Sequence, residues 1–212
     1  MIRARSLAAI GALAIALGAC TAAATPASTD LVPPGGIGGT CPSSQPLALQ
    51  AGETRTVTIS TSQGEFTITV TANLSPIAAG NFVALAECGY YDGVVFHRLV
   101  PGFVIQGGDP SGNGTGGPGY SIADEPVTAT YHRATVAMAR SAAPNSQGSQ
   151  FFVVLDDRAA QALASYNTYA IFGEVTAGMD TVDQIAAMPN SGSPDNSALQ
   201  PVAMDSVTVS TP

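Results

Sequence analysis

β-Branched and polar residues alternate along the first segment that is rich in large apolar side chains. In residues 54–71, TRTVTISTSQGEFTITVT, the alternation runs on both sides of Gln63-Gly64. A period of two residues interrupted by a glycine turn predicts two antiparallel strands joined as a hairpin. After the hairpin, Ser75, Pro76 and a later Gly89 bracket apolar residues at helical spacing. Serine at the N-cap and proline at the first helical position predict a helix over residues 76–87.

The rest of the chain consists mainly of short apolar runs separated by clusters of Gly, Pro, Asn and Asp. The runs are VVFHRL, FVIQG, TVAMA, SQFFVVL, AIFGEV and AMDSVTVS. Many short strands with such turns predict an all-β barrel or sandwich, and residues 179–187 predict a second helix. The pattern therefore indicates about eight strands and two helices in one domain over residues 53–212. Side chains fill the interior of a barrel of about eight strands, so a ligand site is expected on its wall.

The N-terminal residues have a different composition. Arg3 and Arg5 precede an apolar run over residues 7–17, and residues 1–20 are therefore typical of an export signal peptide. The run ends in LGAC, which resembles the lipobox of bacterial lipoproteins and implies lipid attachment at Cys20. The alternative is an ordinary signal peptide with a chance cysteine. Residues 21–52 are rich in Ala, Thr, Pro, Gly and Ser, and we expect a disordered tether there.

Charge and cysteine content narrow the possible partners. The 212 residues include no Lys, and 15 acidic residues outnumber seven Arg, which gives a net charge of −8. Because an acidic surface repels phosphate backbones, nucleic acid is excluded as a partner. Cys41 and Cys88 remain once Cys20 is set aside. In an oxidising compartment two alternatives stay open for them, a disulfide or two free thiols.

Three features suggest other chemistry but do not support it. His97 and His132 have no carboxylate or cysteine at the spacing of metal ligands, so no metal site is expected. The segment GGDPSGNGTGGPG, residues 107–119, lacks the Gly-Lys-Ser/Thr of a phosphate loop and is expected to be a surface loop. Asp156 and Asp157 are adjacent, so their side chains diverge in extended chain, and they are assigned no catalytic role.

Four longer motifs occur in a fixed order along the chain. They are FHRLVPGFVIQGGDP at residues 96–110, GNGTGGPG at 112–119, VAMARSAAPNSQGSQFFVV at 136–154 and YAIFGEV at 169–175. In order and wording, these motifs resemble the cyclophilin family of peptidyl-prolyl cis-trans isomerases, and the likeness covers about residues 53–210. The resemblance implies a closed eight-stranded antiparallel barrel capped by two helices.

The resemblance also implies which residues carry the activity. The family's catalytic arginine follows Phe-His, which is Arg98 in this chain. No metal, cofactor or nucleophile is implied. Phe103 and Phe152 match the family's apolar floor for the proline ring. Because neighbouring strand residues point to opposite faces, the adjacent Phe151 is expected in the core.

Further residues match the parts of the family's site that hold the peptide chain. Gln106 and Gln150 match amide contacts, although glutamines here could instead satisfy buried backbone groups. Ala139 and Arg140 match the segment that binds the residues before proline, with the Arg140 backbone bonded to the substrate chain. Gly114 lies in the Gly-rich loop that flanks the pocket.

Three pocket positions depart from the eukaryotic members of the family. Val104 stands where those members have Met, and Tyr169 replaces a His. The chain contains no Trp, and Leu163 is expected to replace the Trp of the pocket rim.

Together these features predict an exported isomerase that accelerates rotation of X–Pro bonds in peptides and unfolded exported proteins. We expect it to be a monomer, lipid-anchored to the outer face of the bacterial cytoplasmic membrane. The alternative is a peptide-binding or scaffold module without catalysis, because a proline pocket can bind without turning over.

Overall fold

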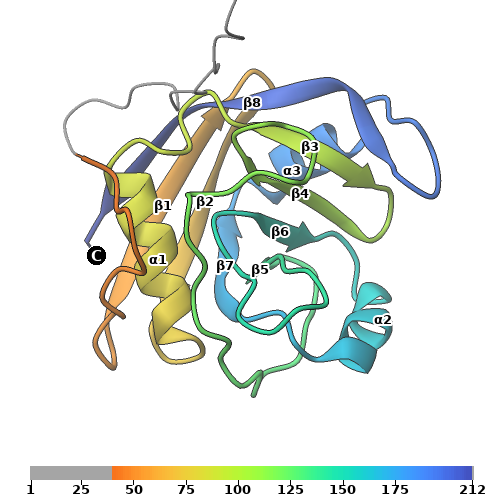
Figure 1. Ribbon diagram of the computed structural model, residues 1–212. Helices are drawn as coiled ribbons and strands as arrows, with labels where there is room; N and C mark the ends of the chain where they lie inside the picture. Colours follow the sequence, from red (N-terminus) through yellow and green to blue (C-terminus); the bar gives the residue numbers. More distant parts are fainter. Residues whose placement is uncertain (1–39, 212) are drawn as a thin grey trace, which may run out of the picture. The chain divides into compact units, whose positions relative to one another are not determined.

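The computed structural model describes residues 40–211, whose main feature is a closed barrel of eight antiparallel strands (Figure 1). Neighbouring strands follow one another around the barrel in the order β1-β2-β7-β5-β6-β4-β3-β8. The prediction of a closed barrel is confirmed, and the sandwich is excluded. The strands are β1 Thr54–Thr61, β2 Gly64–Thr71, β3 Val95–Val100, β4 Val104–Asp109, β5 Thr135–Met138, β6 Phe151–Val154, β7 Ile171–Ala177 and β8 Ser197–Ser210.

The strands follow the alternation of the sequence. β1 and β2 form the predicted hairpin, in which Thr61 pairs with Gly64. In β2, the buried residues Phe66, Ile68 and Val70 alternate with polar ones. The longest strand, β8, pairs with β1 on one side and with β3 on the other, so it closes the barrel.

Three helices accompany the barrel in the described residues, so the prediction of two helices was wrong. The two predicted helices are present as α1, Pro76–Glu87, and α3, Met179–Ala186. α1 packs against β1, β2, β7 and β8, whereas α3 packs against β2, β3 and β4. The missed helix is α2, Ala159–Tyr166, which buries only Ala159 and Leu163. A helix with so few buried positions leaves almost no apolar periodicity in the sequence.

The buried side chains form two separate clusters. The inner cluster fills the barrel and includes seven large aromatic residues, Phe66, Phe82, Tyr90, Tyr91, Phe96, Phe151 and Phe172. The rings of Phe82 and Phe172 lie 4.7 Å apart, and Phe151 meets Phe82 edge-on at 5.2 Å. The outer cluster lies on the wall around β4, β5 and β6 and consists of Val104, Tyr131, Ala137, Phe152, Val154, Ala159, Leu163 and Ile171.

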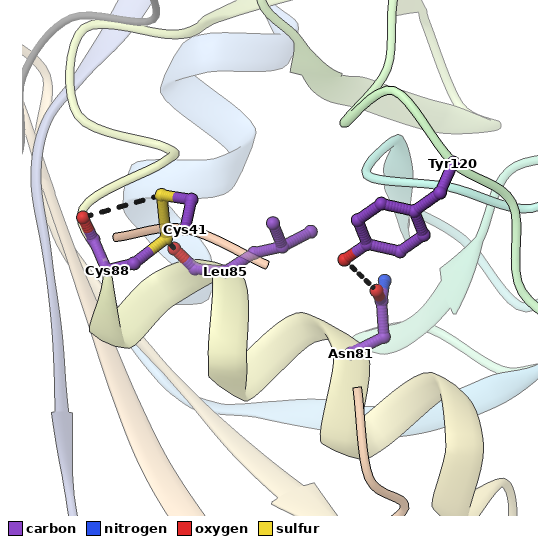
Figure 2. Close-up of a disulfide and its surroundings, with 5 residues drawn as sticks. All are labelled: Cys41, Asn81, Leu85, Cys88 and Tyr120. Atoms are coloured by element: carbon purple, nitrogen blue, oxygen red, sulfur yellow. Dashed lines mark hydrogen bonds between the residues drawn. A yellow bond between two sulfur atoms is a disulfide. The ribbon is translucent and has the colours of Figure 1, made fainter. Parts of the chain in front are cut away.

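Residues 40–52 are fixed against α1, although the sequence placed them in the tether. A disulfide joins Cys41 to Cys88 at the end of α1 (Figure 2). The Leu49 N–H donates to the carbonyl of Pro76 at 3.1 Å. Residue 80 is a glycine, and a Cβ there would collide with the Leu47 carbonyl. The tether prediction was therefore wrong for residues 40–52, because covalent and backbone contacts hold a segment that is poor in large apolar side chains.

The other predictions for the N-terminal part of the chain concern residues that the structure does not describe. The signal peptide, lipidation at Cys20 and residues 21–39 of the tether lie outside the described residues. Within residues 40–211, no helix is both long enough and apolar enough to cross a membrane.

A residue distant in sequence completes the N-terminus of α1. Ser75 occupies the predicted N-cap position, but its side chain makes no capping hydrogen bond. The carboxylate of Glu125 accepts hydrogen bonds from the N–H groups of Ile77 and Ala78 instead, both at 2.8 Å. Burial raises the pKa of Glu125, although these two hydrogen bonds oppose the rise. The loop before β5 is thus attached to α1.

Candidate active site

Arg98 reaches the outer wall because β3 contains a β-bulge at His97. Phe96 and Arg98 pair with consecutive residues of β4, so His97 is the extra residue between the two pairs. A bulge of this kind changes which face the following side chains occupy. Phe96 and Leu99 therefore both belong to the inner cluster, whereas Arg98 lines a cavity on the outside of the barrel.

This cavity, which we call the apolar cavity, has a volume of about 420 Å³. Phe152 and Leu163 are each 4% exposed, and their side chains form part of its apolar wall. Tyr169 meets Phe152 edge-on, with 5.4 Å between ring centres. The apolar cavity is lined by Arg98, Phe103, Val104, Gln106, Ala139, Arg140, Phe152, Ala162, Leu163, Tyr166 and Tyr169. A hollow of this size with an apolar wall and few polar groups suits a small ring.

A second cavity, the amide cavity, adjoins the first and has a volume of about 350 Å³. It shares Gln106, Ala139 and Arg140 with the apolar cavity. Gln106 donates from Nε2 to Oε1 of Gln150 at 2.9 Å. Gln150 in turn donates from Nε2 to the carbonyls of Gly114 at 3.0 Å and residue 116 at 2.9 Å. Gln150 thus does satisfy backbone groups, and the two glutamines connect β4 and the start of β6 to the glycine-rich segment of residues 107–119, which we call the glycine loop.

The glycine loop folds around a buried carboxylate. Asp109 is fully buried, and its two oxygens accept hydrogen bonds from the N–H groups of Ser111 at 2.7 Å, Asn113 at 3.0 Å and Gly114 at 2.6 Å. Burial alone would raise the pKa of Asp109, but these backbone donors and that of Gly116 hold the pKa below its ordinary value of 3.8. The charge of Asp109 therefore fixes the loop whose carbonyls receive Gln150.

Arg140 uses its side chain within the protein. Its guanidinium pairs with Asp124 at 3.1 Å and donates to the carbonyl of Ala143 at 2.8 Å. The side chain is 10% exposed. Within residues 40–211, the backbone N–H and carbonyl of Arg140 have no hydrogen-bond partner. An extended segment with unpaired backbone groups can accept a peptide as an added strand.

The two cavities bring together every catalytic and substrate-binding residue predicted from the sequence. Gly114 and Gln150 line the amide cavity, and the remaining predicted residues line the apolar cavity. Phe151 belongs to the inner cluster and Phe152 to the outer one. Within the described chain, no group of three or more His, Cys, Asp or Glu could hold a metal ion.

Comparison with known proteins decides the family. Residues 56–209 match the family described as cyclophilin type peptidyl-prolyl cis-trans isomerase. The chain belongs to the cyclophilin family. Peptidyl-prolyl cis-trans isomerase B of Streptomyces anulatus is 42% identical over 173 residues, which cover 73% of this cyclophilin and 95% of that protein. A peptidyl-prolyl cis-trans isomerase of Acinetobacter baylyi is 39% identical over 160 residues, covering 72% and 84% of the two chains.

Solved cyclophilin structures show the same fold. The crystal structure of a cyclophilin type isomerase of Cryptosporidium parvum has a TM-score of 0.65 and 28% identity to this chain. The match covers 75% of this chain and 99% of the other. A second crystal structure of that protein was obtained in the presence of the dipeptide Ala-Pro, with 29% identity and a TM-score of 0.65. This cyclophilin is thus a peptidyl-prolyl cis-trans isomerase by family and by fold.

Sequence reasoning missed several residues of this cyclophilin's site. Ala162 and Tyr166 line the apolar cavity from α2, and they were missed because α2 itself was not predicted. Asp109 was treated only as part of a surface loop. A single acid among the seven glycines and two prolines of residues 107–119 was the available signal, since backbone N–H groups in glycine-rich turns converge on an anion.

Proposed function

We propose that this cyclophilin accelerates rotation about X–Pro bonds in peptides and unfolded proteins, and that Arg98 is its catalytic residue. The observation that carries the proposal is a guanidinium at the edge of an apolar cavity that also contains Phe103 and Phe152. The Ala-Pro dipeptide used with the C. parvum relative supports a proline-containing ligand for this cavity.

Rotation about an X–Pro bond requires the conjugation of its amide to be broken, but no covalent bond is cleaved. The C–N bond has partial double-bond character, and its rotational barrier is ~18–20 kcal/mol. Uncatalysed isomerisation at proline takes roughly 10–100 s, whereas ordinary enzymes turn over at about 1–1000 s⁻¹. The site must therefore supply about 10- to 10⁵-fold, or ~1.4–7 kcal/mol. One charge-assisted hydrogen bond and substrate positioning can account for this amount.

A guanidinium suits this task because it donates without needing to change its protonation state. As the bond twists, the lone pair localises on the prolyl nitrogen and becomes an acceptor. Arg98 donates from Nε to the carbonyl of Asp195 at 3.3 Å, which orients the planar group. In residues 40–211, its two Nη groups have no protein hydrogen-bond partner, so four N–H bonds stay available. A donor that meets its acceptor only in the twisted state lowers the barrier.

The remaining site residues position the peptide. The proline ring occupies the apolar cavity, and the residues before it follow the unpaired backbone at Arg140. Gln106 lines both the apolar and amide cavities, so its carboxamide can contact the substrate chain where the two meet. In this arrangement the proline is held while the preceding carbonyl rotates.

The test is exchange spectroscopy by NMR on a short Ala-Pro peptide. Arg98→Ala is expected to lower kcat/KM by at least about 100-fold, the effect of removing one transition-state donor. Arg55→Ala is the matched control, because Arg55 lies on β1 and pairs with Glu53 away from the cavities. Equal activity of Arg98→Ala and wild type would refute the assigned role. A wild type that binds the peptide without isomerising it would select the scaffold alternative.

We further propose that the chain is exported and lipid-anchored through Cys20. The apolar run and LGAC ending of residues 1–20 support this proposal. The disulfide between Cys41 and Cys88 also supports it, because disulfides persist in oxidising compartments outside the cytoplasm. Cys20→Ser is expected to move the protein from the membrane fraction to the soluble fraction in a bacterial host. Unchanged fractionation of Cys20→Ser would refute the proposed lipid anchor.

A further inference from the structure

A buried asparagine lies behind the wall of the amide cavity and has no part in the proposed mechanism so far. Asn81 belongs to α1 and is fully buried, and it lines neither the apolar nor the amide cavity. A carboxamide carries two donated hydrogens and an acceptor, and burying it is costly unless these groups are paired. The partners of Asn81 therefore show what the residue holds in place.

Both ends of this carboxamide are bonded to the wall of the amide cavity. Its Oδ1 accepts a hydrogen bond from the hydroxyl of Tyr120 at 2.8 Å (Figure 2), and its Nδ2 donates to the carbonyl of Gly148 at 2.7 Å. Tyr120 and Gly148 both line the amide cavity. One buried side chain thus fixes two points of the cavity wall from behind.

These two points belong to different segments of the chain. Tyr120 follows the glycine loop, whereas Gly148 precedes β6. An isolated β-bridge between Ile122 and Gln147 joins the two segments, and a Cβ at Gly148 would lie 3.0 Å from the side chain of Pro118. Both segments lie outside the eight strands. Side-chain contacts, rather than a continuous ladder of backbone hydrogen bonds, therefore set their separation.

Two tyrosines that follow α1 hold the next residue of the wall. Ser149 lines the amide cavity, and its carbonyl accepts a hydrogen bond from the hydroxyl of Tyr91 at 3.0 Å. The hydroxyls of Tyr90 and Ser149 lie 3.1 Å apart. Asn81 differs from these tyrosines because it bonds to both segments of the wall, so it can fix the distance between them.

We propose that Asn81 is a positioning residue, which sets the width of the amide cavity and thereby the affinity for residues that precede proline. In the proposed function these residues follow Arg140, which lines both cavities. Contacts with the chain away from the rotating bond hold the ground state and the transition state equally, so they act on KM rather than on kcat. This inference rests on the proposed function and deepens it, because it assigns a residue outside both cavities.

The experiment uses the full chain and two blocked peptides, acetyl-Ala-Pro-Ala-amide and acetyl-Ala-Ala-Ala-Ala-Pro-Ala-amide. Exchange spectroscopy by NMR gives kcat and KM for each, and the readout is the ratio of kcat/KM for the long peptide over that for the short one. The wild type is expected to favour the long peptide at least about tenfold. Asn81→Leu is nearly isosteric and removes both hydrogen bonds, so it should lower this ratio at least about fivefold through KM. Tyr120→Phe removes one hydrogen bond and should lower the ratio about fivefold.

The double variant separates positioning from direct contact with the peptide. Because the hydroxyl of Tyr120 acts through Asn81, its removal in the Asn81→Leu background should change the ratio by less than about twofold. A full fivefold loss in that background would show that the hydroxyl contacts the peptide itself. That result would overturn the positioning role of Asn81.

Thr135→Val is the matched control for the loss of a buried hydrogen bond. Thr135 is 1% exposed on β5 and lines neither cavity, and its hydroxyl accepts from the N–H of His132 at 3.0 Å. This variant should lose stability and keep the wild-type ratio. Urea denaturation measures the stability of every variant, and Tyr120→Phe carries the test should Asn81→Leu not fold.

The remaining outcomes separate this inference from the proposed function. An equal fall of the ratio in Thr135→Val and Asn81→Leu would overturn the positioning role, as would a loss confined to kcat. Equal kcat/KM for the two peptides with wild type would also overturn it, while leaving the isomerase intact. Absence of isomerisation of either peptide by wild type would instead overturn the proposed function.

Discussion

Two neighbouring phenylalanines show how differently the inside and the outside of this barrel are built. Phe151 is fully buried in the inner cluster, where it contacts the rings of Phe82, Tyr91 and Phe96. Phe152 is 4% exposed, meets one ring, that of Tyr169, and lines the apolar cavity. Strand alternation alone separates them. One residue therefore stabilises the fold, while the next is available to a ligand.

The two regions differ in what holds them. The inner cluster consists of apolar side chains from strands and two helices, and its packing needs no specific partner. The outer wall depends on polar contacts between distant segments, such as the Gln106–Gln150 pair and the loop around Asp109. The apolar cavity is lined by residues of β3, β4, β6 and α2 and by residues that flank these elements. The site is thus less densely packed than the inner cluster, and polar groups in fixed positions surround it.

The largest effect on stability is expected from truncating the two neighbouring phenylalanines, one in the inner cluster and one in the outer wall. Phe151→Ala should lower the free energy of unfolding by about 3–5 kcal/mol, because the surrounding rings leave an internal cavity. Phe152→Ala should cost only about 1.5–3 kcal/mol, the transfer term, since water can enter the space beside the open cavity. The activity should respond in the opposite order. Phe152→Ala should lose at least about tenfold in kcat/KM, with ~1.4 kcal/mol per decade.

Urea denaturation and the NMR exchange assay measure the two quantities on the same samples. Stability and activity falling in parallel in both variants would contradict the division between inner and outer clusters. The comparison needs no separate control, because each phenylalanine is the control for the other.

The second prediction concerns the buried charge behind the outer wall. Asp109→Asn should cost about 3 kcal/mol, because its amide group meets N–H donors that require an acceptor. It should also lower kcat/KM, since the loop carbonyls at Gly114 and Gly116 position Gln150. Asp205→Asn is the control, as Asp205 is exposed on β8. Unchanged kcat/KM in Asp109→Asn would show that the loop around Asp109 does not affect the activity of the site.

The pH dependence of this effect has a definite sign. The folded-state pKa of Asp109 lies below 3.8, so the folded state holds fewer protons than the unfolded state. Its stabilisation is therefore present above pH 3.8 and is lost as the pH falls through the folded pKa. Asp109→Asn should show a smaller loss of stability than wild type over this acidic range. Denaturant titrations between pH 5 and pH 3 measure the difference.

The same contrast explains which parts could be predicted from the sequence. The hairpin, α1 and the opposite directions of Phe151 and Phe152 follow from local periodicity, which is visible in a few consecutive residues. The motifs fixed the family, and thereby Arg98 and the pocket residues. Alternation alone would place Arg98 on the same face as Phe96, because nothing in FHRLV reveals the bulge at His97. The cap on α1 from Glu125 and the packing of residues 40–52 depend on contacts across the fold, which no local pattern records.

The smallest predicted effect concerns His97, which lies at the boundary between the two regions. Asp109 and Arg98 are the charged groups that act on it, and Asp195 lines a cavity with it. Its folded-state pKa is lowered below 6.5 mainly by burial, so below pH 6.5 the unfolded state binds a proton that the folded state does not. The free energy of unfolding must therefore fall as the pH falls from 6.5 toward the folded pKa, and it must be unaffected by this group above pH 6.5.

His97→Gln removes the titrating ring, so its stability should change less than that of wild type between pH 7 and pH 5. His132→Gln, in which an exposed histidine is removed, should follow the wild-type curve. A wild-type slope that persists in His97→Gln would show that the ring is protonated equally in both states, and that the outer wall is open to water as far as the bulge.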